Sequence, residues 1–124
     1  MRKKILVIDD DPEIVKLLTV RLGDNDFNVI SANDALYAVR MAFEEKPDLI
    51  ILDVNMPGGG GVSVFDRVRK LKTTTNVPVI FLSGCEDKDI QKQVLENGAV
   101  GFISKPFKSE ELLSVIRKAL GETQ

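Results

Sequence analysis

Short runs of apolar residues recur along the chain, and most of them hold only four to six residues. They are rich in Val and Ile and stop at polar positions: Ile5–Ile8, Phe27–Ala32, Leu49–Leu52, Val77–Leu82 and Val100–Ile103. Runs of this length and composition are typical of strands buried on both faces of a sheet. Their first residues stand 22 to 28 positions apart, which predicts five strand–helix units with extra residues in the third.

Between these runs the apolar positions change to a helical period. One stripe holds Ile14, Leu17, Leu18 and Leu22, and another holds Leu112, Ile116, Ala119 and Leu120. Strands that alternate with helices indicate a parallel sheet covered by helices on both faces. The sequence therefore predicts one α/β domain.

Start and stop signals flank the predicted helices. Asp11-Pro12 is a typical N-cap followed by proline at the first helical position. Glycine after a helix favours its termination, so we expect the helices to end at Gly23, Asn97-Gly98 and Gly121. Ser109, followed by Glu110 and Glu111, is expected to open the last helix.

Polar side chains follow four of the five predicted strands. They are Asp9-Asp10-Asp11, Asp53, Ser83 and Ser104-Lys105-Pro106. Ligands of open α/β sheets bind at the carboxyl ends of the strands. If the first and third strands are neighbours, three carboxylates converge there, and two like charges about 4 Å apart repel by roughly 4 kcal/mol at an effective dielectric of 20. A cation would remove this penalty, and an all-oxygen donor set favours Mg²⁺.

Each of these residues also has an ordinary structural interpretation. Asp11 is explained as a helix cap, Asp9 or Asp10 as a loop carboxylate, Ser83 as a turn former and Lys105 as a solvated loop residue. Their joint position at one edge favours Mg²⁺-dependent phosphoryl transfer onto an aspartate, with a lysine and a hydroxyl binding the other phosphoryl oxygens. The pattern alone leaves open which aspartate accepts the group.

The composition narrows the alternatives. The 124 residues include no histidine, which excludes Ser-His-Asp triads, imidazole zinc sites and histidine general bases within them. A net charge of −2 argues against binding nucleic acid or anionic lipid through bulk charge. The single cysteine, Cys85, forms no internal disulfide and fits a reducing compartment. No apolar run has the length of a signal peptide core or a membrane span, so we expect a cytoplasmic protein.

Four motifs together resemble the receiver domain of two-component response regulators. They are Asp9-Asp10, Asp53 in Leu-Asp-Val-Asn-Met-Pro, Ser83 in Phe-Leu-Ser-Gly, and Lys105-Pro106-Phe107. The resemblance extends from about Lys4 to Leu120. It implies a flavodoxin-like fold with strand order 2-1-3-4-5 and a single receiver domain over residues 1–124.

The resemblance also implies a role for each site residue. Asp53 would be the phosphoacceptor, and Mg²⁺ would be held by Asp9, Asp10, Asp53 and the backbone carbonyl of Asn55. Lys105 would contact the phosphoryl oxygens. Its peptide bond to Pro106 would be cis.

Two further residues would carry the switch in the same family. Ser83 would bond the phosphoryl group through its hydroxyl. Phe102 stands at the aromatic switch position, where tyrosine is common, so it can pack but offers no phenol hydrogen bond.

The family further implies partners. A sensor histidine kinase or a phosphotransfer protein would supply the phosphate from a phosphohistidine, which must lie outside these residues. The switched surface would be the fourth helix, fifth strand and fifth helix, roughly Lys88 to Leu120. It would bind an output partner or an effector domain, and a phosphorylation-dependent homodimer is a further expectation, with no nucleic-acid or membrane contact by this domain. The domain would be a switch that catalyses only its own phosphorylation and dephosphorylation.

Two alternatives stand beside this interpretation. A small phosphatase of the haloacid dehalogenase type would use Asp53 as nucleophile, although Asn55 replaces its usual second aspartate and the chain is short for a substrate cap. A degenerate receiver that serves only as a binding module would not bind Mg²⁺.

Three further local features are open to interpretation, and two of them have competing explanations. Gly58–Gly61 is interpreted as a flexible turn or as a flap beside Asp53. The basic run Arg67, Arg69, Lys70 and Lys72 is interpreted as a solvated helix face. Cys85 would either tune the lifetime of the phosphate or fill a small buried space.

Overall fold

The strands and helices alternate along the chain, as the apolar pattern predicts. The computed structural model describes residues 2–56, 60–84 and 88–121. Within them the strands are β1 (Lys4–Ile8), β2 (Asn28–Ala32), β3 (Leu49–Asp53), β4 (Val79–Ser83) and β5 (Gly101–Ser104). The helices are α1 (Pro12–Asp24), α2 (Ala35–Glu45), α3 (Gly60–Lys70), α4 (Lys88–Glu96) and α5 (Ser109–Ala119).

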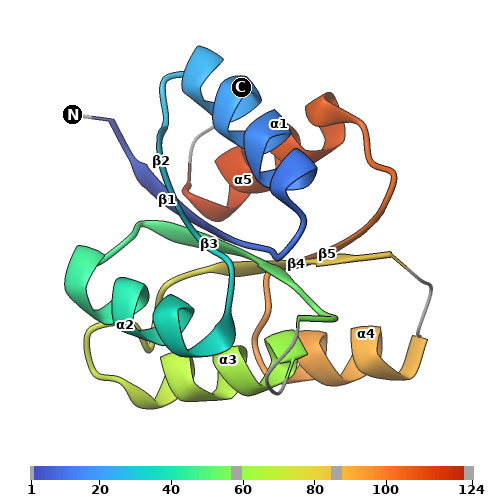
Figure 1. The fold of residues 1–124 in the computed structure, drawn as a ribbon. Coiled ribbons are helices and arrows are strands. Elements are labelled where there is room, and N and C mark those ends of the chain that lie inside the picture. Colours follow the sequence, from blue (N-terminus) through green and yellow to red (C-terminus); the bar gives the residue numbers. More distant parts are fainter. Residues whose placement is uncertain (1, 57–59, 85–87, 122–124) are drawn as a thin grey trace.

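The strands form one parallel sheet in the order β2-β1-β3-β4-β5, which confirms the predicted flavodoxin-like topology. Figure 1 shows α1 and α5 on one face of the sheet and α2, α3 and α4 on the other. Every position of β3 and β4 is buried because helices cover both of their faces. β1 lies beside β3, so the carboxyl ends of these two strands meet at one edge.

Side chains that alternate along the strands divide the core into two clusters. The cluster under α1 and α5 contains Ile5 and Val7 of β1, and the cluster under α2, α3 and α4 contains Leu6 and Ile8. Burying such a side chain completely stabilises the fold by about 1.5–3 kcal/mol. Leu17 departs from the predicted stripe because it is 40% exposed, while Leu18 and Leu22 face the sheet.

The predicted helix boundaries are confirmed at most ends. The Asp11 side chain accepts a hydrogen bond from the Glu13 N–H at 2.9 Å, and Pro12 is the first residue of α1. Gly98 (φ 102°) and Gly121 (φ 77°) follow α4 and α5 in the left-handed conformation. None of the helices in the described ranges is long and apolar enough to span a membrane.

One boundary prediction is wrong. Gly23 does not end α1, which continues through Asp24 to an Asn25 cap. The Asn25 amide donates to the Leu22 carbonyl, and Asp26 takes the left-handed conformation (φ 69°) in place of the glycine. Ser109 opens α5 as predicted, and Lys108 before it holds the cap position without a side-chain hydrogen bond.

Candidate functional site

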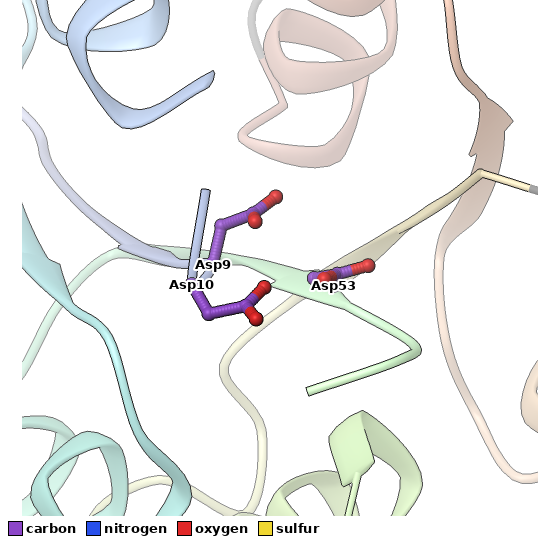
Figure 2. Close-up of side chains that lie close together, drawn as sticks. All are labelled: Asp9, Asp10 and Asp53. Atoms are coloured by element: carbon purple, nitrogen blue, oxygen red, sulfur yellow. The ribbon is translucent and has the colours of Figure 1, made fainter. Parts of the chain in front are cut away.

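Three carboxylates meet at the carboxyl edge of the sheet, as the strand-end pattern predicts. Asp9 and Asp10 follow β1, and Asp53 is the last residue of the neighbouring β3. One oxygen atom of each lies within 4.8 Å of the others, and Figure 2 shows the three side chains gathered there. Asp9 and Asp53 are only 1% and 5% exposed, whereas Asp10 is open to solvent. The cluster thus combines close like charges with partial burial.

Lys105 partly balances this charge. Its Nζ lies 3.0 Å from Asp9 Oδ2 and 3.6 Å from Asp53 Oδ1. Its backbone N–H donates to the Ser83 carbonyl at 2.7 Å, which ties the segment after β5 to the end of β4. The Lys105–Pro106 peptide bond is cis, as the resemblance implied.

The pKa values of Asp53 and Lys105 are both raised, but for different reasons. Burial and the charges of Asp9 and Asp10 raise the pKa of Asp53, although the Lys105 charge and the Asn55 N–H act in the opposite direction. Burial alone lowers the pKa of Lys105, but the hydrogen bond and charge of Asp9, with the charge of Asp53, outweigh it and leave that pKa above its ordinary value. Three carboxylates and one ammonium group leave the cluster with a formal charge of −2.

Ser83 and Asn55 stand at the same edge of the sheet as Asp53, and Phe102 lies on β5. Ser83 ends β4, is 1% exposed, and stands at the same sheet edge as Asp53 on the adjacent strand. The Asn55 N–H donates to Asp53 Oδ1 at 3.3 Å, which orients the carboxylate. Phe102 of β5 is beside Phe81 of β4 in register, and its partly buried side chain packs against the cluster under α2, α3 and α4.

Gly60 and Gly61, the second half of the glycine run, form neither a flexible turn nor a flap. Gly60 and Gly61 are the first residues of α3, and the Gly61 N–H donates to the Val54 carbonyl at 2.8 Å. A Cβ atom at Gly61 would lie 2.1 Å from the Asp53 carbonyl oxygen, so only glycine lets α3 approach the strand so closely. Gly58 and Gly59, like Cys85, lie outside the described residues.

The basic run is solvated except at one residue. Arg67, Lys70 and Lys72 are exposed as predicted, but Arg69 is half-buried. Its guanidinium donates to backbone carbonyls and lies 4.8 Å above the Phe65 ring, and burial lowers its pKa. The available signal was the spacing of four residues between Phe65 and Arg69, which places both on one face of α3.

Comparison with known proteins assigns the family. The profile of the family described as "Response regulator receiver domain" matches residues 5–117. The chain belongs to the response regulator receiver family. Receiver domains of this family are signalling switches of two-component systems.

The chain is similar to regulators with known names. It is 36% identical over 120 residues to the DNA-binding response regulator MtrA of Mycolicibacterium smegmatis, covering 97% of this chain and 51% of MtrA. It is 37% identical over 116 residues to the transcriptional regulatory protein KdpE of Mycobacterium tuberculosis, covering 94% of this chain and 50% of KdpE. The chain thus spans about half the length of these curated relatives.

Solved structures of receivers share the fold. The chemotaxis protein CheY4 of Vibrio cholerae superposes with a TM-score of 0.90 at 28% identity, covering 96% of this chain and 99% of CheY4. The receiver domain of the sensor histidine kinase PA1611 of Pseudomonas aeruginosa superposes with a TM-score of 0.89 at 25% identity. That comparison covers 98% of this chain and all of the PA1611 domain, which holds a magnesium ion in its active site cleft.

Proposed function

We propose that Asp53 accepts a phosphoryl group from a phosphohistidine on a sensor histidine kinase or phosphotransfer protein, in a reaction that requires Mg²⁺. The observation that carries the proposal is the cluster of Asp9, Asp10 and Asp53 within 4.8 Å, with Lys105 in contact with two of its members. Family membership supports the receiver over the phosphatase alternative. No histidine stands among the 124 residues, so the donor imidazole lies outside them.

The donor atoms fit Mg²⁺. The three carboxylates and the backbone carbonyl of Asn55 offer oxygen only, which is the donor set that this ion prefers. Mg²⁺ supplies positive charge that offsets the repulsion among the carboxylates and neutralises a phosphoryl group. The magnesium ion in the PA1611 receiver supports this assignment.

The transfer exchanges one bond to phosphorus for another. An Asp53 carboxylate oxygen attacks the phosphorus atom, and the bond from phosphorus to the donor imidazole nitrogen breaks. The nitrogen leaves with the electron pair, so the products are an aspartyl phosphate and a histidine without its phosphate. Lys105 and the Ser83 hydroxyl then bind phosphoryl oxygens and hold the group beside Asp53.

The phosphate changes a surface some distance away. The Ser83 hydroxyl, once engaged by the phosphoryl group, biases the Phe102 ring and with it the surface of α4, β5 and α5 between two arrangements. That surface binds an output partner, a second copy of the chain or an effector domain. The DNA-binding relatives, which are about twice as long, support an effector domain attached to this single receiver domain of residues 1–124.

Phosphorylation by a small donor tests the proposal. The purified chain is incubated with acetyl phosphate and Mg²⁺, and intact mass spectrometry follows the addition of one phosphoryl group. We expect one group on the wild type and on Asp66→Asn, an exposed control on α3, and none on Asp53→Asn. No addition to the wild type, or equal addition to Asp53→Asn, contradicts the assignment of Asp53. Sustained turnover of a generic phosphate ester would instead favour the phosphatase.

A further inference from the structure

Arg69 connects three segments that lie apart in the sequence. Its Nη1 donates to the carbonyls of Val77 at 2.7 Å and Thr74 at 3.4 Å, in the turn that leads into β4. Its Nη2 donates to the carbonyl of Gly98 at 3.5 Å, in the turn between α4 and β5. One side chain on α3 therefore contacts both ends of the segment that runs from β4 through α4.

A cation is an unusual choice for this position. In the described part of the chain, each hydrogen bond of the Arg69 side chain ends on a backbone carbonyl and none ends on a carboxylate. Half-burying a charge without a counter-ion is unfavourable, because the guanidinium loses part of its hydration. The planar guanidinium, however, offers several donors in a fixed fork and a flat face for the Phe65 ring. The position thus retains a group suited to holding several carbonyls at once.

The Arg69 guanidinium also packs on Phe65, which belongs to a group of aromatic side chains next to Phe102. The rings of Phe65 and Phe81 meet edge to face, with centroids 5.3 Å apart. Phe81 is in register with Phe102 and lies two residues before Ser83, so the Phe81 and Ser83 side chains share one face of β4. Phe102 packs against the core cluster that contains Phe65 and Phe81. Arg69 therefore contacts the turn that follows α4, whereas Ser83 lies before α4. Both positions border the surface of α4, β5 and α5.

The turn that Arg69 contacts also ends α4. The Gly98 amide donates to the Leu95 carbonyl at 3.2 Å, and the Ala99 amide donates to the Val94 carbonyl at 2.9 Å. Gly98 itself has a φ of 102° and lies exposed at the surface. A turn of this kind opens easily unless something holds it, and the Arg69 bond to the Gly98 carbonyl does so from α3.

We propose that Arg69 is a positioning residue that tethers the turn between α4 and β5 in its resting place and so limits how often the unphosphorylated domain reaches its switched arrangement. This inference rests on the proposed function, since it concerns the surface that phosphorylation of Asp53 would change. Loss of the tether shifts the two-state equilibrium without touching the carboxylate cluster.

Two NMR measurements on the unphosphorylated protein test the tether, with Arg69→Met compared with Arg67→Met, an exposed position on the same helix. We expect amide hydrogen exchange at Gly98 and Ala99 to rise severalfold in Arg69→Met, because the contact of Arg69 Nη2 with the Gly98 carbonyl at 3.5 Å is lost. Arg67→Met leaves these amides unchanged. Amides of β3 serve as the reference for global opening.

The second readout is the position of the Phe102 ring signal between two endpoints, the resting wild type and the wild type with Mg²⁺ and beryllium fluoride, a phosphoryl substitute. We expect Arg69→Met to move the resting signal toward the beryllium fluoride endpoint, whereas a purely structural role would lower global stability and leave the signal at rest. Unchanged exchange at Gly98 and Ala99, or a Phe102 signal that stays at rest, overturns the inference.

The variant Arg69→Lys and the response of the wild type to beryllium fluoride serve as controls. Arg69→Lys keeps the charge and the aliphatic stem, but its single ammonium cannot span three carbonyls, so it should give the same changes at smaller amplitude. It decides the question if Arg69→Met does not fold. If the wild type itself fails to respond to beryllium fluoride, the proposed function is at fault, and the exchange measurement, which needs no phosphoryl group, alone decides the tether.

Discussion

Neutralising Asp53 should stabilise the protein when divalent cations are absent. Asp53 faces both Asp9 and Asp10, with one oxygen of each within 4.8 Å of the others. At that upper limit and an effective dielectric of about 20, two unit charges repel by about 3.5 kcal/mol. Lys105 at 3.6 Å attracts Asp53 by about 4.6 kcal/mol on the same basis. These charges alone disfavour the charged form by about 2 kcal/mol. Burial, the largest cause of the raised pKa of Asp53, adds to this cost, whereas solvent around the exposed Asp10 screens part of the repulsion.

Asp53→Asn keeps the shape of the side chain and an oxygen that can accept the Asn55 N–H. We expect its free energy of unfolding in EDTA at neutral pH to exceed the wild-type value by about 1–2 kcal/mol. For a domain of this size that corresponds to a melting temperature about 4–8 °C higher. Thermal unfolding followed by circular dichroism measures the difference, with Asp66→Asn as the matched control at an exposed position.

The dependence on pH and Mg²⁺ identifies the cause. Because the folded protein raises the pKa of Asp53, its carboxylate destabilises the fold at high pH, and this penalty disappears as the pH falls toward the ordinary value of 3.8. The advantage of Asp53→Asn should shrink over the same range. Saturating Mg²⁺ should stabilise the wild type more than the variant, by about 2.7 kcal/mol at a hundredfold excess over its Kd if the variant does not bind it. A variant less stable than the wild type in EDTA at neutral pH would refute the reasoning.

Three further predictions concern single contacts and are all measured by chemical denaturation. Gly61→Ala should destabilise the protein strongly or prevent folding, because its Cβ would lie 2.1 Å from the Asp53 carbonyl oxygen. Gly23→Ala, with open space around it in α1, should stabilise the protein by about 0.5–1 kcal/mol. Similar effects of the two substitutions would contradict the close approach. Thr74→Val should cost about 1–3 kcal/mol, because the buried Thr74 hydroxyl donates to the Val68 carbonyl at 2.6 Å, while the exposed Thr75→Val should cost much less because water can replace its bond. Asp11→Ala should cost about 1 kcal/mol through the lost N-cap, and Asp11→Asn should restore most of it; an equal loss in both would point to charge rather than to capping.

Much of the fold could be predicted because the responsible physics is local. Apolar runs of four to six residues mark strands, and the carboxylates after the first and third of them mark the functional edge. The strand order came from the resemblance, since spacing alone does not determine which parallel strands are neighbours. Once β1 and β3 are neighbours, the convergence of Asp9, Asp10 and Asp53 follows from the topology.

The wrong predictions arise where contacts that the apolar and glycine pattern does not display decide the structure. Asn25 and Asp26 end α1 with side-chain and backbone bonds, so Gly23 is not needed for that purpose. Gly61 is fixed by the backbone of Asp53, which no local pattern displays. Arg69 was grouped with its charged neighbours because its partners Val77 and Gly98 come later in the chain and offer only backbone carbonyls.

The ion pair between Lys105 and Asp9 joins residues 96 positions apart. The segments after the first and last strands must both be in place before this contact forms, and such long-range contacts are slow to form. A chain still emerging from the ribosome, or one cut between these positions and separated, would present the Asp53 carboxylate without its lysine. Under the proposed function, the ability of Asp53 to accept a phosphoryl group would develop late in folding, and its phosphorylation would report that the whole sheet has been assembled.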